Sequence, residues 1–416
     1  MSRANSLTSS IETKTSTSTF AGGRLRSIDA LRGAAALAVV LYHAVGQAPQ
    51  DEKSALIHVL AAPVRALSAY GYAGVFLFFV ISGFCIHLHW AKARAASPTA
   101  ATPKVAFVPF WKRRILRLYP PYLIALALYL LLPALKNGVV VDGFFLWDTA
   151  LHLLMLHNFD PHTVYSINGV FWTLAIEEQL YLAYFLLLFI RRRWGWKWTL
   201  ITCAAARVVW VVLCIVLQRT AGVEIPVPES AASHWFTWAL GALGVEAMYG
   251  LVALPRLMRD LRVAAAALLS AVGLSLLLPV IVQHSLWHTC AWLLLHPLWG
   301  VGFFIVINRA VLAERNWREW FDVPRLVRWS ATVGLFSYSL YLIHQLVLME
   351  MWRFWILRMP TILVALLVST PLSVACSYLF FRYCERPFLP RPAKSPVTVA
   401  TPPAHLTPDP LLNESA

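Results

Sequence analysis

Residues 171–193 of this chain read FWTLAIEEQLYLAYFLLLFIRRR. The stretch contains about twenty predominantly apolar residues, which is the length that an α-helix needs to cross a bilayer. Three arginines, Arg191 to Arg193, follow directly, and basic residues collect on the cytoplasmic side of membrane helices. The stretch therefore predicts a transmembrane helix that enters from the outer face and ends at the cytoplasm.

The same pattern recurs along the chain and sets the fold class. Of 416 residues, 59% are hydrophobic and only 13% are charged, whereas a soluble domain carries about 25% charged residues. We predict an all-α, polytopic integral membrane helix bundle with about ten transmembrane helices. The predicted spans are 30–47, 71–90, 115–135, 171–190, 198–218, 234–252, 263–283, 288–307, 331–352 and 361–381.

Two classes of ligand are not expected from the composition. The net charge of +15 lies in short loops between apolar blocks, where it orients a membrane protein, so we expect no nucleic-acid partner. The six cysteines form neither a CxxC pair nor a Cys/His cluster with the spacing of metal ligands, so we expect no metal.

Segment 144–159 is ambiguous, because it is short for a span and carries polar residues. If it does not cross and the N-terminus is cytoplasmic, most lysines and arginines fall on the cytoplasmic side. If it crossed, the basic cluster at 191–197 and every later loop would change sides. We therefore predict a multi-pass protein of the inner (plasma) membrane with both termini cytoplasmic. In this topology 144–159 is a helix that lies at the outer surface or dips into it.

The two ends differ from the rest in composition. Residues 1–23 are polar and rich in serine and threonine, without the apolar core of a signal peptide. Residues 391–416 are rich in proline, threonine and alanine. We expect both to be disordered and cytoplasmic, and to flank one membrane domain at 24–390.

Ionisable groups inside a bilayer are costly and mark candidate functional residues. Arg32 and His43 in the first span are eleven residues apart, which puts them on one helix face about 16 Å apart along the axis. Asp29 precedes them. Spacing alone leaves two interpretations open. The two residues form a functional pair, or the arginine reaches head groups and the histidine bonds a neighbouring helix.

A basic cluster begins the third span, where Arg113, Arg114 and Arg117 crowd its cytoplasmic end. Guanidinium groups suit phosphate because they form bidentate hydrogen bonds with it. A topology signal with lipid head-group contacts explains any single arginine equally well. Arg117 is the strongest candidate, since it lies inside the apolar run.

Further polar residues occur in three other spans. Glu177 lies about 9 Å below the outer edge of its span, in the same half of the membrane as His43, where a carboxylate is paired, protonated or catalytic. We expect the neighbouring Glu178 to face head groups. His344 is a second histidine of the outer half, either functional or bonded to a neighbouring helix. Glu385, at the cytoplasmic end of the last span, is expected to pair with an arginine.

Residues 74–84, GVFLFFVISGF, contain glycines and a serine that allow close helix approach. This composition indicates packing more often than catalysis. Ser82 has no base beside it in the sequence, so it is not assigned as a nucleophile.

The polar groups divide by depth in the membrane. The arginines lie at the cytoplasmic end, whereas a histidine and a carboxylate lie in the outer half. This division suits a phosphate-bearing donor from the cytoplasm and a general base that activates an acceptor hydroxyl. It also suits a multi-pass transporter or exporter of a glycan or metabolite, in which buried charges mark an ion route. A purely structural scaffold does not account for the buried His43 and Glu177.

Six segments in this order resemble the acyltransferase-3 family of integral membrane O-acyltransferases, and the resemblance covers 24–390. The segments are RSIDALRGAAALAVVLYH, GVFLFFVISGF, FWKRRILRLYP, VFWTLAIEEQLY, SYSLYLIH and CERP. The resemblance implies ten transmembrane helices and transfer of an acyl group, often acetyl, from acyl-CoA as co-substrate. The implied acceptor is a hydroxyl of a cell-surface or exported saccharide or glycolipid.

By position, His43 matches the essential histidine of the family and Glu177 the carboxylate of its WTLxxE segment. Arg32 matches the arginine eleven residues before the histidine, and Arg114 and Arg117 match the basic pair of the third motif. The implied hypothesis is that the three arginines hold the phosphates of acyl-CoA. His43 would act as general base or briefly carry the acyl group. Glu177 would orient His43 or stabilise its cationic form.

Asp29, His344 and Glu385 would support this site, Glu385 as the acidic residue of the last motif. The chain departs from many relatives in its short tail after residue 390, since those relatives carry an extra helix and a hydrolase-like domain there. We therefore expect it to act alone or with a separate periplasmic partner protein, among membrane lipids. Glu178 is an additional acid compared with the family motif.

Overall fold

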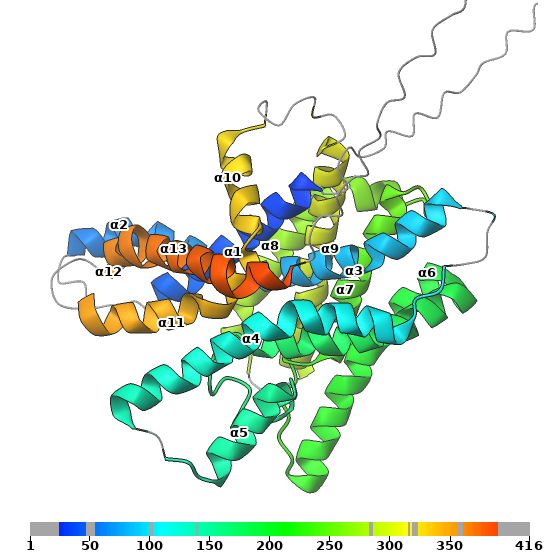
Figure 1. Ribbon diagram of the computed structural model, residues 1–416. Coiled ribbons are helices and arrows are strands. Elements are labelled where there is room, and N and C mark those ends of the chain that lie inside the picture. Colours follow the sequence, from blue (N-terminus) through cyan, green and yellow to red (C-terminus); the bar gives the residue numbers. More distant parts are fainter. Residues whose placement is uncertain are drawn as a thin grey trace, which may run out of the picture.

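The computed structural model describes residues 25–46, 55–97, 99, 103–138, 140–282, 286–314, 317, 323–355 and 361–389. This part of the chain is helical and contains no strand, which confirms the predicted fold class (Figure 1). The terminal segments that the sequence predicts to be disordered, 1–23 and 391–416, lie outside the described residues.

The described residues form a succession of α-helices joined by loops and short turns. The first part of the chain forms α1 (Arg26–Gly46), α2 (Ala55–Ser68), α3 (Gly74–Ala96), α4 (Phe107–Asn137), α5 (Gly143–Leu153), α6 (Trp172–Ala221) and α7 (Ala231–Met248). The second part forms α8 (Leu261–Leu277), α9 (Leu286–Glu314), α10 (Arg325–Gly334), α11 (Ser337–Trp355), α12 (Thr361–Val364) and α13 (Thr370–Phe380). Short turns extend several of these helices, among them η1 (Gly71–Ala73), η2 (His157–Phe159), η4 (Leu278–Val280), η6 (Ala365–Ser369) and η7 (Phe381–Glu385).

Seven helices of the described chain are long and apolar enough to cross a membrane, and an eighth span results if α10 and α11, which meet at 81°, form one. Each of the ten spans predicted from the sequence nevertheless falls on a helical segment. The number of candidate spans in the structure is smaller than the ten predicted from the sequence for two reasons. The 50-residue α6 breaks at Gly195, where φ is +79°, and so contains two predicted spans. α7 carries His234 and Glu246 and is buried along most of its length, and a helix enclosed by other helices can carry polar groups.

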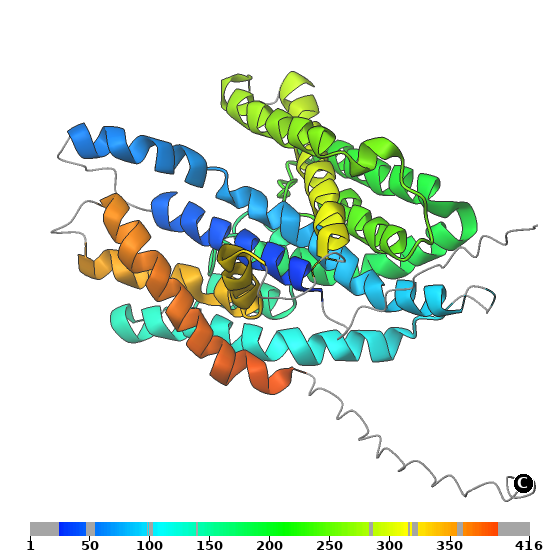
Figure 2. The same cartoon turned by 90° about the horizontal axis from the view of Figure 1, so that it is seen from above.

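The helices form two groups with α3 between them (Figures 1 and 2). α1, α4, α11 and α13 run beside one another in the first group, and the second contains α6, α7, α8 and α9. α3 packs along α1 on one side and along α7 on the other. α10 stands across α1 and is seen nearly end-on in Figure 2.

The crossing of α1 and α10 is a contact between backbones. A Cβ on Gly33 would lie 1.8 Å from the carbonyl oxygen of Ser330, and a Cβ on Gly334 would lie 1.9 Å from that of Asp29. No side chain fits at either distance, so glycine is required at both positions. The crossing holds in place the turn of α1 that carries Arg32.

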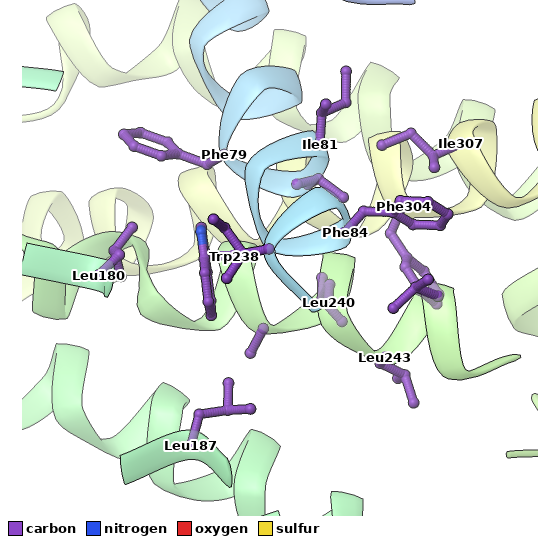
Figure 3. Packing of buried hydrophobic residues seen from close by; sticks show 14 of the residues in the cluster. Phe79, Ile81, Phe84, Leu180, Leu187, Trp238, Leu240, Leu243, Phe304 and Ile307 are labelled. Carbon is purple, nitrogen blue, oxygen red and sulfur yellow. The ribbon is translucent and has the colours of Figure 1, made fainter. Parts of the chain in front are cut away.

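The crossing of α3 and α7 is equally close. A Cβ on Gly83 would lie 1.9 Å from the carbonyl oxygen of Trp238, and a Cβ on Gly241 would lie 1.9 Å from that of Val80. Apolar side chains of α3, α6, α7 and α9 surround this point (Figure 3). The packing role predicted for the glycine of segment 74–84 is thus confirmed.

The predicted helix at 144–159 is α5 followed by the turn η2, and it is not among the candidate spans. The connection from η2 to α6 enters the bundle, because Asn168 and Phe171 are only 2% and 0% exposed. Thr173, at the start of α6, donates a hydrogen bond of 2.7 Å to the hydroxyl of Tyr341 in α11. α6 therefore begins inside the protein and not at its outer edge.

Two histidines of this connection stack on each other. The rings of His152 and His157 lie with centroids 3.9 Å apart and nearly parallel, and both side chains are fully buried. Burial, with a smaller contribution from the His152 ring, lowers the pKa of His157 from 6.5 to about 3. His157 therefore stays uncharged in the folded protein over most of the acidic range.

Candidate active site

A cavity of about 220 Å³ lies between α1, α3, α4, α6 and α11. Its lining combines three guanidinium groups, one carboxylate and several hydroxyl groups with apolar side chains. The polar residues of the lining are Arg32, Ser82, Arg114, Arg117, Thr173, Glu177, Tyr181, Ser337, Tyr338 and Tyr341. The cavity thus brings together four residues singled out in the sequence, namely Arg32, Arg114, Arg117 and Glu177.

The three arginines of the cavity have no acidic group in direct contact within the part of the chain that the structure describes, although Glu177 lines the same cavity. Within the described residues, neither Arg32, Arg114 nor Arg117 forms an ion pair shorter than 4 Å. The guanidinium of Arg114 lies over the ring of Phe110, 4.8 Å from its centroid. Cations that converge on a cavity in this way can bind an anion, and guanidinium groups match the oxygens of phosphate.

Glu177 is held in the cavity by two hydroxyl groups. Ser82 of α3 donates a hydrogen bond of 2.7 Å to its Oε1, and Tyr181 of α6 donates one of 2.6 Å to the same atom. The indole of Trp238 in α7 donates in turn to Ser82, at 3.2 Å. The close crossing of α3 and α7 thus fixes the position of the carboxylate. Ser82, assigned only to packing from the sequence, has Glu177 beside it in space.

Glu177 and His43 form no hydrogen bond or ion pair with each other within the described residues. Glu177 lines the cavity, whereas His43 is not among its lining residues. The predicted action of Glu177 on His43 therefore stays a prediction.

His43 has His344 as its partner instead. The Nδ1 of His43 lies 3.1 Å from the Nε2 of His344, and the two rings are tilted, with centroids 5.1 Å apart. His344 is fully buried, whereas His43 is half-buried. Of the two interpretations of His344, the structure shows a bond to a neighbouring helix, and the bonded residue is the candidate catalytic histidine itself.

Glu385 has a serine as its partner. Its carboxylate accepts hydrogen bonds from the hydroxyl and the backbone N–H of Ser339 in α11, and the side chain is 3% exposed. The expected pairing with an arginine is wrong, because no arginine lies within 4 Å of it in the described chain. Glu385 therefore ties the last helical segment to α11.

Glu178 does not face head groups. It is 7% exposed, and neither carboxylate oxygen has a hydrogen-bond partner among the described residues. The expectation was wrong because this turn of α6 lies within the bundle. Asp29 is also buried, at the crossing of α1 with α10.

A second polar cluster escaped the sequence analysis. Glu246 of α7 accepts hydrogen bonds from Arg191 and Trp196 of α6 and bonds the Nε2 of His87 in α3 at 2.9 Å. The Nδ1 of His87 lies 3.0 Å from the hydroxyl of Tyr184. All these groups are satisfied by one another, so the cluster joins three helices. A histidine and a glutamate within apolar spans were the only signal for it.

Comparison with known proteins agrees with the acyltransferase-3 resemblance. A family model described as an acyltransferase domain matches residues 25–382. "Acyltransferase MdmB" of Streptomyces mycarofaciens is 30% identical over 172 residues, which are 39% of this chain and 38% of that protein. "Nodulation protein 10" of Rhizobium leguminosarum bv. viciae is 28% identical over 153 residues, 33% of this chain and 39% of that protein.

A third relative is "O-acetyltransferase OatA" of Staphylococcus aureus, which is 28% identical over 171 residues. These residues are 38% of this chain and 24% of that protein. The chain thus matches well under half the length of each of the three relatives, and no solved structure matches it. Because the family model covers most of its length, the chain belongs to the acyltransferase-3 family of membrane acyltransferases.

Proposed function

We propose that this protein moves an acyl group, which we take to be acetyl, from cytoplasmic acyl-CoA to a hydroxyl of a cell-surface or exported saccharide or glycolipid. The observation that carries the proposal is the cavity with three arginines that form no direct ion pair within the described residues, on the same helix bundle as a half-buried histidine. The name of one relative, an O-acetyltransferase, supports acetyl as the group transferred.

Arg32, Arg114 and Arg117 bind the phosphates of the donor. Acyl-CoA bears its phosphates at one end and its thioester at the other, joined by the extended pantetheine arm. Arg32 and His43 stand on one face of α1, about 16 Å apart along its axis. The arm therefore runs along α1 from the arginines and brings the thioester to His43. In this arrangement both termini are cytoplasmic, on the side from which the donor enters.

His43 acts first as base and then as acid. Its ring takes the proton of the acceptor hydroxyl while that oxygen bonds to the thioester carbonyl carbon. The carbon–sulfur bond then breaks, and the thiolate of CoA leaves with the electron pair. The imidazolium returns the proton to this sulfur, so the products are the O-acyl ester and CoA thiol.

Glu177 acts at the donor end of the site. Three guanidinium groups repel one another when no phosphate is bound, and a carboxylate in the same cavity offsets this repulsion. Ser82 and Tyr181 bind one oxygen of Glu177, which keeps the carboxylate from collapsing onto a single arginine.

Calorimetric titration of the purified protein with CoA tests the donor site. We expect Arg117→Gln to weaken the affinity about tenfold or more, because a charge-assisted hydrogen bond contributes about 1.5–3 kcal/mol. Arg113→Gln is the matched control, since Arg113 lies four residues earlier on α4 and does not line the cavity. Equal affinity of Arg117→Gln and the wild type would remove Arg117 from the donor site.

A further inference from the structure

The hydrogen bonds of His344 define which of its ring nitrogens carries a proton. Its Nδ1 lies 2.9 Å from the carbonyl oxygen of Leu340 and 3.0 Å from that of Tyr341. Carbonyl oxygens only accept hydrogen bonds, so Nδ1 must carry the hydrogen. The ring is fully buried and has no ion pair in the described chain. A cationic ring here would be a buried charge without a counter-ion, which is costly, so Nε2 of His344 bears a lone pair.

This assignment determines the protonation of His43. The Nε2 of His344 and the Nδ1 of His43 are 3.1 Å apart, and one of the two must donate. Since Nε2 of His344 has no hydrogen, Nδ1 of His43 is the donor. A neutral imidazole has a single N–H, so the Nε2 of His43 is unprotonated.

We propose that His344 is a positioning residue that holds His43 in the tautomer whose Nε2 is free to take the proton of the acceptor hydroxyl. The inference rests on the proposed function, because it assigns the atom of His43 that does the chemistry. The bonds run in one direction, from Nδ1 of His43 to His344 and from Nδ1 of His344 to the backbone of α11. Both N–H groups are thereby used. The ring of His43 also bonds the backbone carbonyl of Val39, one turn earlier on α1, so both rings are fixed in orientation.

A neutral partner has a chemical consequence. A carboxylate beside His43 would stabilise the imidazolium and so hold the proton more tightly. His344 supplies orientation without charge, so the protonated His43 returns its proton readily to the departing thiolate. This role needs only a hydrogen-bond acceptor at the position of Nε2, which suggests how it can be tested.

Three substitutions of His344 distinguish the effect of the hydrogen-bond acceptor at Nε2 from the effect of the volume of the ring. In His344→Gln, the amide oxygen reaches the position of Nε2 and can accept the bond from His43. In His344→Asn the same amide is one methylene shorter and falls short of that position. His344→Met fills the space of the ring and offers only a weak acceptor.

The assay uses membrane vesicles from expressing cells and radiolabelled acetyl-CoA, and measures the label transferred to the saccharide fraction per amount of protein. We expect His344→Met and His344→Asn to lower kcat about 100-fold, with the KM for acetyl-CoA within about threefold because the arginine cavity is intact. We expect His344→Gln to recover most of the loss. Calorimetric binding of CoA confirms that each variant is folded.

His43→Ala, assayed in parallel, distinguishes failure of the positioning role of His344 from failure of the proposed function. If His43→Ala is inactive while His344→Met or His344→Asn transfers label at the wild-type rate, the positioning role is refuted and the proposed function stands. Equal rates for His344→Gln and His344→Asn, both reduced, also refute it, since the reach of the acceptor would not matter. If His43→Ala transfers label at the wild-type rate, the proposed function itself fails.

Discussion

Ser82 of α3 donates a hydrogen bond of 2.7 Å to Glu177 of α6, across 95 positions of the chain. This bond places Glu177 in the cavity with the three arginines. Glu178, the next residue, is buried without a hydrogen-bond partner among the described residues. Two adjacent acids of one helix thus have different environments, and we expect them to respond differently to substitution.

Glu177→Gln should lower the rate of acyl transfer about tenfold or more. The neutral amide no longer offsets the repulsion of the arginines, and it weakens hydrogen bonds that contribute about 1.5–3 kcal/mol to a charged acceptor. Glu178→Gln is the matched control, since the cavity does not include Glu178, and its rate should stay within about twofold. Transfer of radiolabelled acetyl in membrane vesicles measures both. A larger loss in Glu178→Gln than in Glu177→Gln would reverse the assignment.

Gly83→Ala should destabilise the protein and abolish activity. The added methyl group would lie 1.9 Å from the backbone oxygen of Trp238, so α3 and α7 must separate, and the bonds from Trp238 to Ser82 and on to Glu177 would be lost. Gly273→Ala in α8 is the control, because its methyl group meets open space and alanine favours a helix by about 1 kcal/mol. Thermal unfolding in detergent should show a lower Tm for Gly83→Ala only. A Tm equal to that of Gly273→Ala would contradict the close crossing.

Stability should fall as the pH is lowered below about 6.5. His157 has a pKa of about 3 in the folded protein and 6.5 as its unperturbed value. Between these values the unfolded chain binds a proton that the folded protein does not, so unfolding is favoured by up to about 1.4 kcal/mol per pH unit. The stabilisation from the neutral ring is complete above pH 6.5 and is lost towards pH 3.

His157→Phe should weaken this acid sensitivity, because a phenyl ring can stack on His152 and does not titrate. We expect the Tm of His157→Phe, relative to that of the wild type, to be higher at pH 5 than at pH 7.5. His162→Phe, at an exposed position in the same connection, should keep the wild-type profile. A difference in Tm that is the same at both pH values would show that His157 does not contribute.

The orientation in the membrane can be tested with single cysteines in a background without the six native ones. A membrane-impermeant maleimide should label Lys197→Cys only in inverted vesicles, because the arginines before it mark the cytoplasmic side. Gly143→Cys, at the start of α5, should be labelled only in right-side-out preparations. Both positions have room for the new side chain, since Lys197 is exposed and Gly143 borders open space. Labelling of Lys197→Cys from outside would invert the topology.

Most of the fold could be predicted from the sequence, because hydrophobic length directly reflects the thickness of the bilayer. All ten predicted spans coincide with helical segments, and the helix at 144–159 was expected. The helix α2 was not, since residues 55–68 fall between two predicted spans. The burial of the start of α6 could not be predicted either, because burial of Asn168 and Phe171 depends on packing against α11 and has no local pattern.

Arg32, Arg114, Arg117 and Glu177, which the sequence singles out as charges within or beside apolar runs, line one cavity. Their roles, and that of His43, stay predictions. His43 and Glu385 both bond residues of α11. The partner of His43 is 301 positions away along the chain, and that of Glu385 is 46 positions away. No spacing rule connects such positions, so only the folded structure shows that His344 and Ser339 are the residues involved.

Mass spectrometry of cell-surface glycans and secreted saccharides tests the central claim most directly. Cells carrying the wild-type chain are compared with cells carrying His43→Ala and with cells carrying His89→Ala, an exposed histidine of α3, at matched membrane expression. We expect a mass increment of one acyl group with the wild type and with His89→Ala, and none with His43→Ala. An equal increment in all three would contradict the account, because transfer would then not depend on His43.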